Sequence, residues 1–186
     1  MTAIARKDGP RKGAVRAADI PADVLQALSR GEMPSATLAE CMALDQGALM
    51  RAVFPSLSAP ALKAVDAACT LGVLKRMGRV GALLLDELGT DGIARCQAHA
   101  ADTVRGWACF MVGAQPDLDL ALRLAAIRPL ADDMHFGVRE WAWMAMRPHL
   151  ARELDASIAH FAQWTAEPSE RLRRVASEAL RPRGVW

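Results

Sequence analysis

A carboxylate, an indole and several arginines recur at spacings that could place them on one surface. Glu140, Trp143 and Arg147 follow one another at intervals of three and four residues, so they share one side of the chain if this stretch is helical. A fixed carboxylate can stabilise a developing positive charge or position a water molecule, and an indole face attracts cations. Arginine is suited to binding phosphate. Arg174 and Arg181 follow Glu140 and Arg147 at one common interval.

That common interval is the period of a sequence repeat. The dipeptides Val-Arg, Val-Arg and Leu-Arg begin at the equally spaced residues 104, 138 and 172, and Ala108, Ala142 and Ala176 keep the same register. A fixed period of this length without strand-like alternation is typical of stacked helical pairs. The period equals that of tetratricopeptide repeats, but their Trp…Leu-Gly…Tyr signature is missing, and the chain has no Tyr. The sequence therefore predicts an all-α fold, a right-handed solenoid of antiparallel HEAT-like helical pairs.

Periodicity and breaker residues predict where the helices lie. One helix is expected from residue 35 or 37 to residue 54, and a second from about 61 to 77. In the repeated half, helices are expected over 103–113, 117–127, 135–147 and 170–180. Pro148 should open a further amphipathic helix whose buried stripe contains Leu154, Ile158 and Phe161.

Composition favours one helical domain with basic ends. The chain has 186 residues, of which 52% are hydrophobic, and a net charge of +2. Residues 1–16 and 171–186 each carry five Lys or Arg and one acidic residue, which suggests a localised anionic partner or merely solvated tails. We predict that residues 1–19 form a basic, disordered arm and that residues 20–186 form a single HEAT-like repeat domain.

Cysteine and hydropathy patterns argue against metal and membrane. The four cysteines form no close pair and no ligand-like spacing with the four histidines, so we expect small buried hydrophobes and no metal ligands. The chain has no apolar run of membrane-spanning length and no signal-peptide pattern. These features predict a cytoplasmic protein without a membrane partner. The cysteines are Cys41, Cys69, Cys96 and Cys109.

A helical wheel divides the middle copy of the repeat into two faces. One apolar stripe should be buried, and the opposite stripe, which holds Glu140, Trp143 and Arg147, should line the concave surface of the solenoid. The following copy places Arg174 and Arg181 at equivalent positions, and the preceding copy places small residues there. The buried stripe comprises Val138, Trp141, Ala142 and Ala145, and the small residues are Gly106, Cys109 and Gly113.

Each of these residues also has a structural explanation. Glu140 faces Arg174 one repeat along, so an inter-repeat ion pair is as well supported as a functional carboxylate. The three arginines either bind phosphate or form a solvated face. Trp143 is either a contact residue or is covered by the N-terminal arm. A second arginine series, Arg105, Arg139 and Arg173, is expected to form a structural ladder with acidic groups such as Asp102, Asp133 and Glu167.

The C-terminal half resembles a known family. Residues 169–186, SERLRRVASEALRPRGVW, are similar to the closing signature of one branch of the HEAT-like-repeat DNA alkylation-repair family, the bacterial alkylpurine DNA glycosylases. That signature reads Val-Arg-Arg-Leu-Ala-Ser-Glu-Gly, then Arg-Pro-Arg, then a terminal Trp. Residues 135–139 with the Arg-Pro at 147 resemble the preceding repeat, and the likeness spans roughly the last 85 residues. Ala179 departs from the branch's Gly, and Gly-Val at 184 replaces Leu-Pro.

The resemblance implies hydrolysis of the N-glycosidic bond of N3- or N7-alkylated purines in double-stranded DNA, with no metal or cofactor. Because the alkylated base is already cationic, a carboxylate that stabilises the oxocarbenium-like sugar and positions water is sufficient. Carried over by position, Glu140 and Trp143 would lie at the lesion. The DNA contacts would come from Arg147, Arg174, Arg181, Arg183 and Trp186.

The alternative is a non-catalytic HEAT-like binding module, which binds either a protein partner on its concave face or a DNA structure. The environment of Glu140 separates the two hypotheses. A carboxylate open to solvent beside Trp143 favours the enzyme, whereas one fully engaged by Arg174 favours the binding module.

Overall fold

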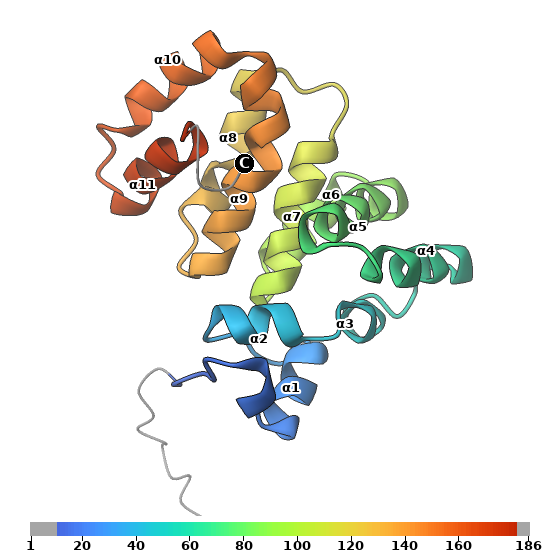
Figure 1. Ribbon diagram of the computed structural model, residues 1–186. Helices are drawn as coiled ribbons and strands as arrows, with labels where there is room; N and C mark the ends of the chain where they lie inside the picture. Colours follow the sequence, from blue (N-terminus) through green and yellow to red (C-terminus); the bar gives the residue numbers. More distant parts are fainter. Residues whose placement is uncertain (1–10, 182–186) are drawn as a thin grey trace, which may run out of the picture.

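The computed structural model describes residues 11–181, and over that range the chain contains eleven α-helices, one 3-10 turn and no strand (Figure 1). The predicted all-α class is confirmed. The elements are η1 (Ala17–Asp19), α1 (Ala22–Ser29), α2 (Leu38–Ala43), α3 (Gln46–Val53), α4 (Ala59–Cys69), α5 (Val73–Leu88), α6 (Asp91–Gln97), α7 (Asp102–Ala114), α8 (Leu120–Ala131), α9 (Phe136–Arg152), α10 (Leu154–Trp164) and α11 (Glu170–Ala179).

Short polar side chains start many of these helices. An N-cap oxygen that accepts a backbone N–H from the first turn replaces a hydrogen bond that the helix itself cannot supply. Asp45 caps α3 in this way and separates it from α2, so the single helix expected over 37–54 is in fact two. At the C-terminal end of α5, Gly89 has a φ of 63°, a left-handed conformation that favours glycine. The other side-chain N-caps are Thr37, Ser58, Asp119, His135 and Ser169.

Four helices form a row of packed neighbours: α5 packs on α7, α7 on α9, and α9 on α11. Helix α8 lies against α7 and α9, and α10 lies against α11, so each covers one side of this row. The starts of α7, α9 and α11, at residues 102, 136 and 170, are equally spaced at the interval of the sequence repeat. The starts of α8 and α10, at residues 120 and 154, keep the same interval. Helices α1, α2 and α3 lie together below the row in Figure 1.

The second arginine series holds the loops between these helices. Arg105, Arg139 and Arg173 each donate two hydrogen bonds, of 2.7–3.0 Å, from one terminal nitrogen to carbonyls five and six residues earlier. Arg105 also pairs with Asp133, as the sequence predicts. The other two use backbone carbonyls instead of acidic side chains. The carbonyls belong to His99 and Ala100, Asp133 and Met134, and Glu167 and Pro168.

A buried arginine closes the turn between α7 and α8. Arg123 is 3% exposed and donates to four backbone carbonyls at distances of 2.7–3.1 Å. Burial lowers its pKa, with a smaller contribution from nearby Arg152. Ser157, at the equivalent position of the next repeat, donates to carbonyls at the turn after α9. The Arg123 acceptors are Val112, Gly113, Gln115 and Leu118.

Three sequence expectations differ from the structure. Helix α9 continues through Pro148 to Arg152 instead of ending before the proline, and Leu154 and Ile158 of the following helix are about half exposed instead of buried. Residues 11–19, expected to be disordered, form an extended segment and η1 that lies on α2 through Arg11. Residues 1–10 of the expected arm lie outside the described residues.

Replacement of Arg123 by Ala should lower the free energy of unfolding by about 3 kcal/mol, because it leaves buried carbonyls without a charged donor. The matched control is Arg128→Ala on the same helix. The Arg128 side chain is 45% exposed and pairs with Glu167 at the surface, so its removal should lower the free energy of unfolding by less than about 1 kcal/mol. Urea denaturation followed by circular dichroism measures both. Equal losses in the two variants would contradict the assigned role of Arg123.

Candidate functional site

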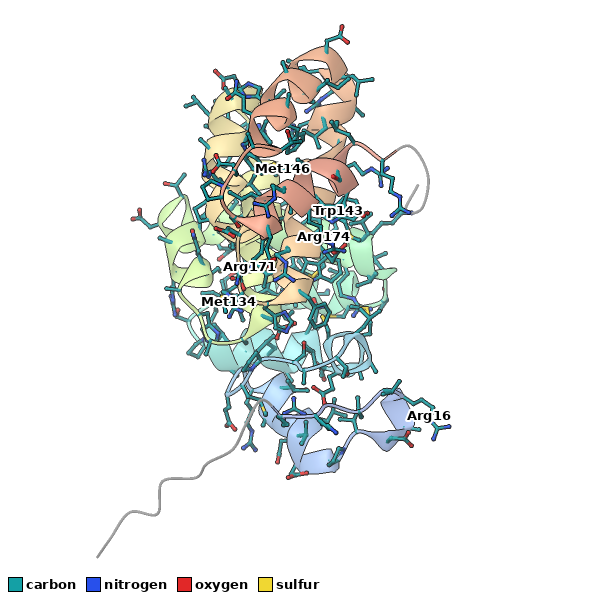
Figure 2. The ribbon with its side chains drawn as sticks, turned by 90° about the vertical axis from the view of Figure 1, so that its left-hand side faces the viewer. Arg16, Met134, Trp143, Met146, Arg171 and Arg174 are labelled. Carbon is teal, nitrogen blue, oxygen red and sulfur yellow. The ribbon has the colours of Figure 1, made fainter. Side chains whose placement is uncertain are left out.

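The carboxylate of Glu140 lies between α9 and α11 and has a partner on each oxygen. Oε1 accepts a 2.7 Å hydrogen bond from Arg174, and Oε2 accepts a 3.0 Å hydrogen bond from the indole N–H of Trp143. The side chain is 29% exposed. In Figure 2, Trp143 and Arg174 lie beside one another on this side of the molecule. The inter-repeat ion pair expected from the sequence is therefore present.

The helical wheel predicts that Trp143 lies on an open face, but in the structure the residue is buried, with 2% of its surface exposed. The guanidinium of Arg147 lies 5.4 Å from the centre of its ring. Arg147 is itself only 7% exposed and donates a 3.1 Å hydrogen bond to the carbonyl of Arg181. Burial lowers the pKa of Arg147 to about 10. Neither side chain is displayed to solvent as a ligand-binding residue would be.

The prediction of an open stripe fails because α9 has a neighbour on both sides. In α7 the equivalent stripe faces α9: a Cβ added to Gly106 would lie 2.7 Å from the Trp141 ring, and the thiol of Cys109 donates to the Val138 carbonyl. In α9 the same stripe faces α11, where Glu140 meets Arg174. A helical wheel separates an apolar face from a polar face, but it does not show that the polar face packs against the next helix.

Partly exposed arginines lie on α11 and just after it. The side chains of Arg171, Arg174 and Arg181 are 32%, 52% and 58% exposed. Arg139 lies close enough that Arg171 and Arg174 lower its pKa, although burial is the larger cause. The cluster of Arg139, Arg171 and Arg174 is partly neutralised by Asp132, Asp133 and Glu140. Arg181, two residues beyond the end of α11, pairs with Glu178 at 3.1 Å. Arg183 and Trp186 lie outside the described residues.

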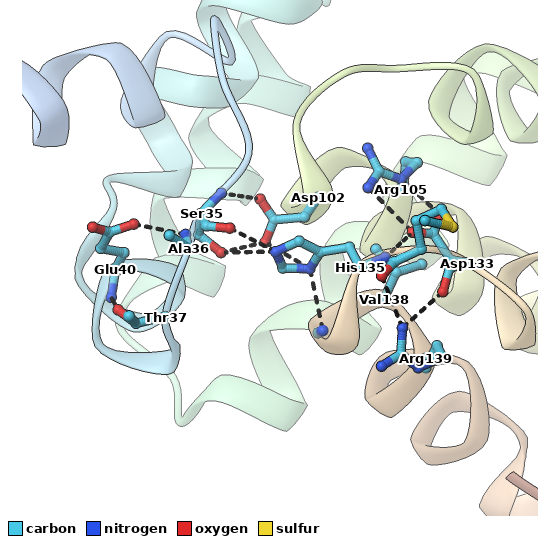
Figure 3. Close-up of polar contacts among 12 residues, drawn as sticks. Ser35, Ala36, Thr37, Glu40, Asp102, Arg105, Asp133, His135, Val138 and Arg139 are labelled. Carbon is cyan, nitrogen blue, oxygen red and sulfur yellow. Dashed lines mark hydrogen bonds and ion pairs between the residues drawn. The ribbon is translucent and has the colours of Figure 1, made fainter. Parts of the chain in front are cut away.

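A second polar cluster, which the sequence analysis missed, joins the N-terminal helices to the row (Figure 3). Asp102, 1% exposed, accepts from both the backbone N–H and the hydroxyl of Ser35 at 2.8 Å. The Nδ1 of His135 accepts from Gly137 N–H, so its Nε2 carries the proton and donates to the Ser35 carbonyl at 2.7 Å. The Ser35 hydroxyl donates to the Asp102 carboxylate, and the imidazole Nε2 has its proton on the Ser35 carbonyl. The imidazole therefore does not act as a base toward the hydroxyl, and the cluster links helices.

A mainly apolar groove lies over α5, α7 and α9. Leu74, Phe110 and Met144 line it, with the cations Lys75 and Arg152 also at its wall. Its lining shares no residue with the arginine cluster around Glu140. The groove offers apolar contact area to a protein partner. Glu140, Trp143 and Arg147, which the sequence predicts as a binding surface, do not line it.

The described residues offer no group of three His, Cys, Asp or Glu side chains that could hold a metal ion. Within the same part of the chain, none of the helices is both long and apolar enough to cross a membrane. Three of the four cysteines are buried, and all four are free thiols, in agreement with their expected role as small hydrophobes. Comparison with protein-family models, curated proteins and solved structures yields no match.

Because Trp143 is buried, truncation to Ala should lower the free energy of unfolding by about 3–5 kcal/mol. Arg174→Ala removes the exposed partner of Glu140 and should cost less than about 1 kcal/mol. Guanidinium denaturation of both variants tests the placement. A Trp143→Ala protein as stable as wild type would mean that the indole is a surface contact residue after all.

Proposed function

We propose that this chain is a HEAT-like helical-repeat protein that binds the backbone of double-stranded DNA without excising a base. The observation that carries the proposal is the pair Arg171 and Arg174 on α11, whose side chains are 32% and 52% exposed. They lie close enough to Arg139 of α9 to lower its pKa. Arg139 itself donates to loop carbonyls, so the two arginines of α11 would make the phosphate contacts. Clustered guanidinium groups on one surface attract a polyanion, and phosphate oxygens match their planar donors.

Repetition of helix starts and of loop contacts supports the HEAT-like part of the proposal. The inner helices begin at equal intervals, and the same arginine position donates to the same pair of loop carbonyls in three successive copies. The equivalents of the stripe that packs in α7 and α9 include exposed Arg174 in α11 and exposed Arg181 just beyond it. A repeat whose outward face is polar is typical of the end of a solenoid, and here that face would meet the DNA.

The expected affinity is modest and depends on salt. Acidic neighbours partly neutralise the cluster, and its exposed members are guanidinium groups that suit phosphate, so contacts to the DNA backbone should dominate. Three or four phosphate contacts give a slope of log K against log salt of about −3. Binding should therefore be nearly independent of sequence and lost at moderate ionic strength.

Replacement of both Arg171 and Arg174 by Ala should weaken binding to a 20-base-pair duplex roughly ten-fold and reduce the salt slope by about two, one for each phosphate contact removed. Fluorescence anisotropy at several salt concentrations measures both quantities. The matched control is Arg51→Ala, which removes another exposed, ion-paired arginine, on α3, and which should leave both unchanged. Identical affinity of the double variant and wild type would refute DNA binding at this surface.

Base excision by an alkylpurine glycosylase is the second candidate, and the C-terminal resemblance together with the 29% exposure of Glu140 supports it. Two contacts weigh against it. The guanidinium of Arg174, 2.7 Å from Oε1, offsets the negative charge that would stabilise a cationic sugar. The second oxygen is occupied by Trp143, whose ring is covered and therefore has no open face for a base.

Incubation of the wild-type protein with methylated duplex DNA should release no 3-methyladenine or 7-methylguanine above spontaneous loss. Chromatography of the free bases is the measurement. Release that Glu140→Gln abolishes, with duplex affinity unchanged, would instead establish the enzyme and make Glu140 its catalytic carboxylate.

Protein binding is the remaining alternative, and the apolar groove over α5, α7 and α9 favours it. The same anisotropy experiment discriminates, because a protein scaffold has no reason to bind DNA in a way that depends on Arg171 and Arg174.

A further inference from the structure

Glu40 of α2 holds the segment of residues 11–14 through a set of specific contacts. Arg11 donates two parallel hydrogen bonds of 2.6 Å to the two carboxylate oxygens. The backbone N–H of Ala14 donates to Oε1 at 3.1 Å, and the hydroxyl of Thr37 donates to the Ala14 carbonyl at 2.5 Å. Glu40 thus binds the guanidinium of Arg11 and the peptide N–H of Ala14, and the N-cap Thr37 binds the Ala14 carbonyl.

The side of this contact that belongs to α2 is built independently of the segment. Thr37 caps α2 by accepting from the backbone N–H of Glu40, and the Glu40 carboxylate accepts a 2.7 Å hydrogen bond from Ala36 N–H. Figure 3 shows Ala36 and Thr37 before α2 and Glu40 in its first turn. The Ala36 N–H holds Oε2 of Glu40 from the receptor's own side, so one part of the receptor geometry is set without residues 11–14.

The segment is bound as a linear motif and adds nothing to the core. None of the side chains of residues 11–20 is buried, and Val15 is 86% exposed. The contact depends on the residue type at one further position: a Cβ on Gly13 would lie 2.7 Å from Glu40 Oε1 and 2.8 Å from the Ala36 Cβ. The bound sequence therefore reads Arg, any residue, Gly, followed by a residue that contributes only its backbone N–H and carbonyl. The attachment depends on these polar contacts and not on buried apolar surface.

The charge of Glu40 decides what can occupy the site. Its side chain is 0% exposed, and the hydrogen bonds from Arg11 lower its pKa to about 2, against the opposing effect of burial. A buried carboxylate without a cation is strongly unfavourable. The planar fork of a guanidinium matches the carboxylate at two points, whereas a lysine ammonium matches it at one. The site therefore selects arginine.

We propose that Glu40, Thr37 and Ala36 form a recognition site for an Arg-X-Gly segment together with the backbone of the residue that follows it. The chain's own residues 11–14 fill the site in cis, and the same segment of a second copy can fill it in trans. A short tether gives the cis segment an effective concentration of about 1 mM. A segment of a second copy therefore occupies the site only when its own concentration is comparable or when the cis segment cannot bind. The inference does not depend on DNA binding or on Glu140.

The test uses the full chain with Gly13→Val, which cannot seat its own segment, and a synthetic peptide of residues 9–17 as probe. Nitrogen–proton NMR spectra recorded while the peptide is raised to about 5 mM, several times the cis effective concentration, should show saturable shifts of the Ala36, Thr37 and Glu40 amides. Wild-type protein should need more peptide for the same shift, because its own segment competes, by a factor of about two when the dissociation constant of the peptide is about 1 mM.

Two peptide variants and one protein variant make the test specific. Peptides with Arg11→Lys or Gly13→Val should lose at least ten-fold in affinity, and Gly72→Val is the matched protein control, because an added Cβ there meets nothing within 4 Å. If Gly13→Val lowers the melting temperature, the wild-type peptide should raise it again and the Arg11→Lys peptide should not. Absence of both amide shifts and thermal recovery overturns the proposal, as does equal binding of the variant peptides.

Discussion

The need to satisfy backbone carbonyls in tight turns between helices shapes most of this structure. Short connections leave the last carbonyls of one helix and the loop carbonyls beyond it without intrahelical donors. Arginine, with five donors in one plane, meets several of them at once. Arg123 does so at the end of α7, and Arg105, Arg139 and Arg173 do so before three successive inner helices. The row of helices keeps its spacing because the loops that set it are held by these side chains.

The same demand determines which arginines remain for a partner. Arginines that bind loop carbonyls have their donors directed into the fold, so their recurrence in the sequence reports architecture rather than ligand binding. Arg171, Arg174 and Arg181 lie farther out and have acidic partners that an anion could displace. Glu140 plays a double part there, since it restrains Arg174 and offsets its charge. That arrangement suits reversible phosphate contact better than stabilisation of a cation.

Two buried carboxylates tie the N-terminal helices to the rest of the chain. Asp102 at the start of α7 binds Ser35, and Glu40 binds Arg11. Both carboxylates are almost completely shielded from solvent, so each requires its donors and each fixes a segment that has little apolar surface of its own. Polar contacts therefore hold residues 11–14 and Ser35, whereas α1 is placed by burial of Leu28 and by packing of Val24 and Leu25 against the core.

The amino-acid sequence by itself determined the all-α class and the approximate helix positions in the repeated half. It also indicated that Arg105, Arg139 and Arg173 have a structural role, although two of them bind backbone carbonyls instead of the expected acidic side chains. Each of these follows from local periodicity and from contacts within a few residues. The tertiary structure decided the rest. Trp143 and Arg147 are buried because α11 and the residues after it lie against the stripe that a lone helix would expose. The segment of residues 11–14 is held because Arg11 binds Glu40, which lies 29 residues farther along the chain. Which face meets a neighbour depends on packing between helices, and that information is not local to any stretch of the chain.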